Sequence, residues 1–180
     1  PAHPPARTPI SLIHHYEHLT GEKLAAAGKA WLSFFGLFLL SWFLLMVGTW
    51  VIYNLYPLLM KQTYQINPGL SSLYYAIAAG IGIFFYAPSG SWSQRFGARW
   101  VVLAGAVMTL VSIGGMALLV LAPPAMQQWL VPPIFIILPV AWSPLIVAGT
   151  ALAGELTTIP QGTAMGLFNA CTALASVLAA

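Results

Sequence analysis

Charged residues are absent from long parts of this sequence. From Trp31 to Met60 there is none, and thirty residues of helix would reach about 45 Å, beyond the ~30 Å hydrocarbon core of a bilayer. Only 5% of the 180 residues are Asp, Glu, Lys or Arg, whereas 59% are apolar. Soluble domains carry about 25% charged residues because their surfaces face water. The chain is therefore expected to be an integral membrane protein.

Apolar stretches recur along the sequence, separated by short segments rich in polar residues, proline or glycine. Residues 1–28 hold four prolines among the first nine positions and are predicted to be an extended linker. Five membrane spans are predicted after it, at about 31–60, 70–89, 100–121, 129–153 and 163–180. The predicted fold class is all-α, a polytopic transmembrane helical bundle.

The basic residues predict the orientation of this bundle. If successive connections alternate between the two sides of the membrane, Lys61 is alone on one side. The other side collects Arg7, Lys23, Lys29, Arg95 and Arg99. By the positive-inside rule, residues 1–28 and the loops 90–99 and 154–162 should be cytoplasmic in a multi-pass protein of the cell membrane. Six scattered basic residues do not form the basic face that nucleic acid requires, so no nucleic-acid partner is expected.

Groupings of catalytic or metal-binding residues are scarce. No nucleophile and base pair up within the predicted spans, so no catalytic residues and no enzyme activity are expected. The single Cys171 excludes an internal disulfide. His14 and His18 have a spacing that can bind zinc, but a solvated linker segment is the favoured interpretation. Neither a metal site nor a cofactor is predicted.

The segment at 90–99, GSWSQRFGAR, is predicted to be a tight loop between the second and third spans. Its glycines permit positive φ and close approach of the two helices. Its two arginines can reach the C-terminus of a neighbouring helix or a carboxylate, for which Glu155 is the candidate.

This segment resembles the loop motif of the major facilitator superfamily, Gly-x-Leu-Ala-Asp-Arg-x-Gly-Arg-Lys. Gly90, Arg95, Gly97 and Arg99 match that pattern, and Gln94 stands in place of its aspartate. A second stretch, from residue 155 to 180, is similar to the family's connection from the tenth helix into the eleventh. The spacing between the two matches leaves room for two spans, as the family requires.

The resemblance implies helices seven to eleven of a twelve-helix secondary transporter, truncated before the last helix. Residues 1–28 would then be the tail of the cytoplasmic linker between two halves, and the N-terminal half of the same chain would be a partner. It also implies a conformational gate made by Gly90, Gln94, Arg95, Gly97, Arg99, Glu155 and Gln161. Gln94 and Gln161 stand at positions that are usually charged in the family. A weaker ionic contact is therefore predicted at this gate, because an amide carries no net charge.

Family members bind their solute near the bilayer midplane between the two halves. The first, second, fourth and fifth predicted spans would line that cavity, and the third would face lipid. The candidate cavity residues are Trp50, Tyr53, Asn54, Trp142, Ser143 and Asn169. Each has an alternative role: the asparagines could form interhelical hydrogen bonds, and Trp50 and Tyr53 could belong to the interfacial aromatic belt.

The resemblance implies a transporter that works by alternating access. Aromatic and amide groups without intramembrane charge suit a small uncharged or amphipathic solute, such as a drug-like compound or a sugar. No ionisable residue lies deep within a span, so a coupling proton would need a site in the other half, or transport is not proton-coupled. Antiport, permease-type uptake and efflux all stay open. The alternative is a sensor or scaffold in the membrane that uses the same fold without transport.

Overall fold

Helices make up the described part of the chain, residues 34–157 and 159–180 of a computed structural model. In chain order they are α2 (Phe34–Leu58), the π-helix η1 (Leu59–Thr63), α3 (Pro68–Phe96), α4 (Ala98–Leu119), α5 (Pro124–Leu156) and α6 (Gln161–Leu178). No strand occurs in these two ranges, which confirms the all-α prediction. The predicted linker at 1–28 and the pair His14 and His18 lie outside the described residues.

Four helical segments are long and apolar enough to cross a membrane: Phe34–Thr63, Pro68–Phe96, Ala98–Leu119 and Pro124–Leu156. The fifth predicted span, 163–180, forms α6, which is not among these four. Its 18 residues include Gln161 and Asn169, and many of the others are small, so its hydropathy is lower. The described helices thus comprise four long apolar segments followed by a shorter, more polar helix at the position of the fifth predicted span.

The start of α3 is encoded by the sequence Asn-Pro-Gly at 67–69. The side-chain oxygen of Asn67 accepts a hydrogen bond from the backbone N–H of Gly69 at 2.8 Å, which caps the helix. Pro68 occupies the first helical position, where a missing N–H costs nothing. The three residues therefore begin a helix directly after the irregular segment that follows η1.

The prediction of a loop at 90–99 is wrong in its extent. α3 continues through this segment to Phe96, α4 begins at Ala98, and Gly97 alone connects them. Gly97 has φ 89°, a value that favours glycine, and its N–H donates to the Ser93 carbonyl at 3.0 Å. The helix extends this far because Ser, Gln and Arg side chains are tolerated on an exposed helical face.

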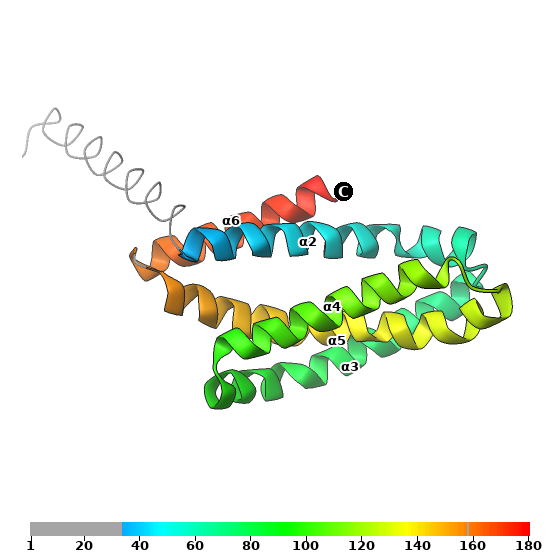
Figure 1. Cartoon of the computed structure of the whole chain (residues 1–180), viewed down its shortest axis with the longest axis horizontal. Coiled ribbons are helices and arrows are strands. Elements are labelled where there is room, and N and C mark those ends of the chain that lie inside the picture. Colours follow the sequence, from blue (N-terminus) through cyan, green and yellow to red (C-terminus); the bar gives the residue numbers. More distant parts are fainter. Residues whose placement is uncertain (1–33, 158) are drawn as a thin grey trace, which may run out of the picture.

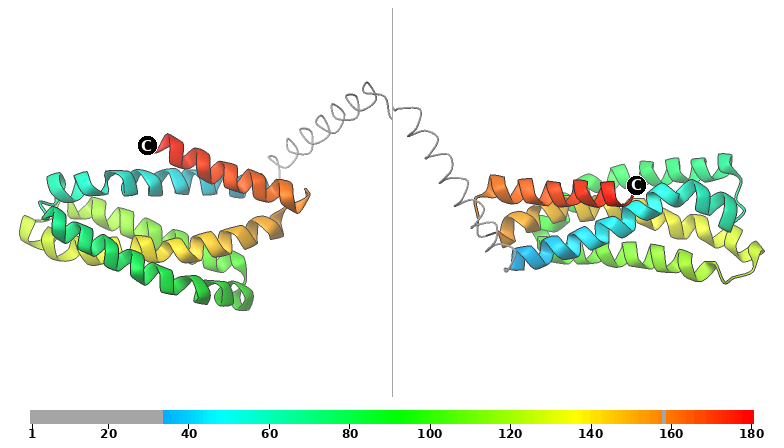
Figure 2. Two further views of the ribbon diagram at one scale, coloured as in Figure 1. Left: turned by 180° about the vertical axis from the view of Figure 1, so that it is seen from behind. Right: turned by 90° about the horizontal axis from the view of Figure 1, so that it is seen from above.

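α5 is the central helix of one group and packs along both α4 and α3 (Figure 1). α2 and α6 lie side by side as a second group above it (Figures 1 and 2). The chain direction alternates, so the α3–α4 and α5–α6 junctions lie at one end of the bundle (Figure 1). The α2–α3 and α4–α5 junctions lie at the other end. Arg95 and Arg99 are therefore at the end opposite Lys61.

Three clusters of buried side chains hold the helices together, two large ones and a small one that joins α4 to α5 through Ala98, Val101, Ala148 and Leu152. The first large cluster joins α2, α5 and α6 and contains Phe35, Trp42, Leu145 and Phe168. In it, the Trp42 and Phe168 ring centroids are 4.8 Å apart, and the Trp42 indole N–H donates to the Thr172 hydroxyl at 2.9 Å. These contacts fix α6 against α2.

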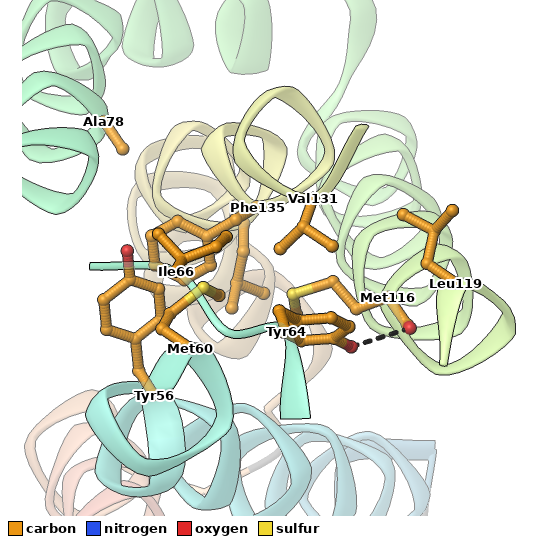
Figure 3. Packing of buried hydrophobic residues seen from close by; sticks show 10 residues of the cluster. Tyr56, Met60, Tyr64, Ile66, Ala78, Met116, Leu119, Val131 and Phe135 are labelled. Carbon is orange, nitrogen blue, oxygen red and sulfur yellow. Dashed lines mark hydrogen bonds between the residues drawn. The ribbon is translucent and has the colours of Figure 1, made fainter. Parts of the chain in front are cut away.

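The second cluster lies at the end of the bundle where α2 and η1 meet α3, α4 and α5 (Figure 3). Tyr56 stacks on Phe135 with ring centroids 4.1 Å apart. The Tyr64 hydroxyl donates to the Met116 carbonyl oxygen at 2.8 Å (Figure 3). Burial raises the pKa of Tyr64 above its ordinary value, which keeps the phenol protonated and able to donate.

Candidate functional site

A cavity of about 420 Å³ lies between α2, α3 and α5. Its lining is mostly aromatic and apolar, with a few polar groups, which is the usual composition of a small-molecule site. The lining residues are Trp50, Tyr53 and Asn54 from α2, Tyr75, Ala79, Gly82, Ile83 and Tyr86 from α3, and Pro139, Trp142 and Ser143 from α5.

The cavity lies near the middle of all three helices that form it. Gly82 is at the midpoint of α3, Pro139 and Trp142 flank the midpoint of α5, and Trp50 is close to the midpoint of the segment Phe34–Thr63. Trp50 and Trp142 also pack against the first core cluster, and Tyr53 packs against the second. The cavity therefore lies between the two large buried clusters, near the middle of the helices that line it.

Aromatic rings form the walls and meet edge to face. Trp50 and Trp142 have ring centroids 5.6 Å apart at an interplanar angle of 77°. Tyr53 contacts Trp142 at 6.2 Å and 87°, and it contacts Tyr75 at 6.1 Å and 81°. Aromatic pairs prefer such arrangements because the positive edge of one ring meets the negative face of the other. The rings thus fix one another's orientation from three different helices.

Two polar side chains of the lining are already engaged within the protein. Ser143 donates its hydroxyl proton to the Gly82 carbonyl oxygen at 2.6 Å, which ties α5 to α3. Asn54 donates from its amide nitrogen to the Ala179 carbonyl oxygen at 2.9 Å, which ties α2 to the end of α6. Both therefore have a structural role as well as a place on the cavity wall. The Ser143 oxygen and the Asn54 side-chain oxygen keep lone pairs that can accept further hydrogen bonds.

No charged side chain lines this cavity among the described residues. The four charged residues of the described ranges are Lys61, Arg95, Arg99 and Glu155, and all of them are exposed near helix ends. The described ranges also contain no group of three His, Cys, Asp or Glu side chains placed to hold a metal ion. The cavity can therefore contact a solute through ring faces, hydroxyls and an amide oxygen.

Five of the six candidate cavity residues meet in this one space: Trp50, Tyr53, Asn54, Trp142 and Ser143. Asn169 does not, since it is exposed on α6 and α6 contributes no lining residue. α4 contributes none either, and Leu103, Leu110 and Leu118 are exposed along it. α4 thus presents an apolar surface away from the cavity.

The second span was predicted to line the cavity, but none of its residues was among the candidates. In the structure, α3 supplies Tyr75 and Tyr86 to the lining. A usable signal exists, because Tyr75, Ala79, Gly82 and Tyr86 recur at spacings of four, three and four residues. Such spacings place all four on one face of a helix over three turns.

The predicted gate residues lie at the end of the bundle that carries the α3–α4 junction. Gly90 faces α5, since a Cβ atom there would contact Val147 at 3.9 Å. The Arg95 guanidinium lies over the Phe96 ring, 5.4 Å from its centroid. Gln94 and Arg99 are exposed, and Gly97 forms the turn itself.

The predicted pairing of Glu155 with Arg95 or Arg99 is not formed. Within residues 34–157 and 159–180, no ion pair of 4.0 Å or less joins these side chains, and Glu155 is exposed at the end of α5. Gln161, at the start of α6, places its amide nitrogen about 3.8 Å from where a Cβ on Gly154 would lie. The connection from α5 to α6 is therefore close-packed at this point, without an ionic latch.

Comparison with known families gives one match. A sequence model of the Major Facilitator Superfamily matches residues 2–180. Because the match covers nearly the whole chain, the chain belongs to the Major Facilitator Superfamily, whose members are membrane transporters rather than enzymes. Searches among curated proteins and among solved structures give no significant match.

Proposed function

We propose that this chain is part of a secondary transporter that moves a small uncharged or amphipathic solute by alternating access. The cavity between α2, α3 and α5 is its contribution to the solute site. The observation that carries this proposal is an aromatic cavity without charged walls at the midpoints of three helices, in a member of a transporter superfamily. Transporters of this architecture bind solutes near the membrane midplane between two halves that rock around the site.

The residues that line the cavity support an uncharged or amphipathic organic solute. A small inorganic ion would lose its hydration shell without gaining a charged partner, at a cost of several kcal/mol. An organic solute can place an apolar body against Trp50 and Trp142 and direct polar groups to the hydroxyls of Tyr53, Tyr75 and Tyr86. Among the described residues these three hydroxyls have no hydrogen bond within the protein, so they are free to bind it.

The orientation of the bundle in the membrane is proposed from the positions of its basic residues. The end with the α3–α4 and α5–α6 junctions, which carries Arg95 and Arg99, faces the cytoplasm, and the end with Lys61 faces outward. In this arrangement the five helices act as helices seven to eleven of a twelve-helix protein. Gly90, Gln94, Arg95, Gly97, Arg99, Glu155 and Gln161 then surround the cytoplasmic mouth of the cavity.

Counterflow in liposomes tests the proposal. Vesicles with the complete transporter are loaded with one unlabelled solute from a broad panel of sugars and amphipathic compounds, and uptake of the labelled solute is followed. We expect transient accumulation for at least one solute, which disappears when Trp50 and Trp142 are both replaced by alanine. If no solute exchanges across the panel, the protein acts as a sensor or scaffold, and the transport proposal fails.

A further inference from the structure

We propose that the cavity selects an amphipathic organic cation, whose alkylated positive group is held by the ring faces of Trp50, Tyr53 and Trp142. This inference rests on the proposed solute site and specifies the charge of the solute. Ring faces carry the negative part of the aromatic quadrupole, so a cation above them is attracted without any carboxylate.

The ring arrangement leaves these faces available. A stacked pair of rings covers one face of each ring, whereas an edge-to-face pair covers a face of only one of them. The contacts of Trp50 with Trp142 and of Tyr53 with Trp142 are edge-to-face, with interplanar angles of 77° and 87°. Tyr75 meets Tyr53 edge to face at 81° but stacks on Phe135 at 28°, so one of its faces is covered. The three rings of Trp50, Tyr53 and Trp142 therefore line the same space without being stacked on one another.

The polar atoms of the lining are compatible with a bound cation. Ser143 has donated its only hydroxyl proton to the Gly82 carbonyl, so its oxygen can only accept. Asn54 has committed one amide proton to the Ala179 carbonyl, and its side-chain oxygen is an acceptor. Neutral donors are also present, among them the Trp50 indole N–H, which is buried without a hydrogen-bond partner. No Lys, Arg or His is present in this lining to repel a cation or to pair with an anion.

The size and polarity of the space restrict the kind of cation. About 420 Å³ is enough for a drug-sized group and much larger than a metal ion needs. A compact, strongly hydrated ammonium would lose too much hydration in a cavity without a carboxylate. A quaternary ammonium group spreads its charge over methyl groups and is weakly hydrated, and aromatic cages recognise such groups.

The test compares two probes that differ only in charge, benzyltrimethylammonium and its carbon isostere neopentylbenzene. Binding of each to the complete transporter in detergent is measured by equilibrium dialysis, with empty micelles as the blank. We expect the cation to bind at least about tenfold more tightly, because cation–π attraction in a desolvated site contributes on the order of tenfold or more. Equal affinity, or tighter binding of the neutral probe, would overturn the inference.

Variants of one ring separate charge recognition from simple packing. We expect Trp142→Leu to weaken cation binding by about tenfold and binding of the neutral probe by less than about threefold, and Trp142→Phe to fall between. The matched control is Trp129→Leu, on the same helix but 82% exposed and outside the cavity, which should leave both affinities unchanged. If Trp142→Leu weakened both probes equally, the ring would act by packing alone and the cation proposal would fail.

The two proposals can fail independently. Loss of charge preference together with intact counterflow of a neutral solute would refute the cation proposal and leave the transport proposal standing. Absence of counterflow for the whole panel, including benzyltrimethylammonium, would refute the transport proposal. Tight, Trp142-dependent binding of the cation without counterflow would support a cation sensor with the same site.

Discussion

Gly82 determines how closely α3 approaches α5 beside the cavity. A Cβ atom at this position would lie 2.9 Å from the Pro139 carbonyl oxygen, a backbone atom that cannot move aside cheaply. The Ser143 hydroxyl binds the Gly82 carbonyl at 2.6 Å, so this piece of backbone is held on two sides. The distance between the α3 wall and the α5 wall of the cavity therefore depends on the absence of one side chain.

Gly82→Ala is expected to destabilise the protein by about 1–3 kcal/mol, since an added methyl group in a packed interface forces the helices apart. The measurement is the thermal unfolding midpoint in detergent, together with the affinity for benzyltrimethylammonium, which should also fall. Gly80→Ala on the same helix is the control, because no atom lies within 4 Å of its Cβ position. Equal unfolding midpoints for the two variants would contradict this account of the α3–α5 contact.

Individual residues show which parts of the site were predictable. Trp50, Tyr53 and Asn54 could be recognised because an amide and two aromatic rings at helical spacing are unusual in a membrane span. Tyr75 was missed because tyrosine near a helix end is equally typical of the interfacial belt. Asn169 was a candidate because it is an amide on a span that the family resemblance implies lines the cavity. The direction in which it points depends on the rotation of α6, which packing determines, and it is exposed outside this cavity.

At the scale of the elements, the α3–α4 junction differs most from the sequence prediction. Hydropathy correctly placed the apolar parts of these helices, but it ended the second span at residue 89, where polar residues begin. α3 continues for seven more residues, to Phe96, because nothing in its sequence stops the helix before Gly97. The polar segment was predicted to be a loop, but it is helical. The turn itself consists of Gly97, whose φ is 89°.

Gly97→Ala should strain this junction, because a left-handed conformation costs a residue with a side chain about 1–2 kcal/mol. We expect a lower unfolding midpoint and faster tryptic cleavage after Arg95 and Arg99, which are both exposed. Gly90→Ala serves as the control, since its Cβ would meet only Val147 at an ordinary contact distance of 3.9 Å. Unchanged cleavage in Gly97→Ala would show that the turn does not need glycine.

At the scale of the whole molecule, the cavity exists because the two large buried clusters do not merge. One cluster fixes α2 to α5 and α6, and the other fixes α2 and η1 to α3, α4 and α5 near the opposite end of the bundle. Between them the large rings of Trp50, Tyr53 and Trp142 hold the helices apart around a space without charge. The helices and five of the eleven lining residues were predicted from the sequence. The space itself could not be predicted, since it depends on how three helices pack.

The most direct test of the central claim is the accessibility of Ala79, an exposed residue of the cavity wall on α3. Ala79→Cys is made in the complete transporter with Cys171→Ser and without other cysteines, and it is reconstituted in liposomes. A membrane-impermeant maleimide is then applied from either side. The account predicts labelling from both sides, with both rates changed by a transported solute, because the cavity opens alternately. Labelling from one side only, whatever solute is present, would contradict alternating access through this cavity.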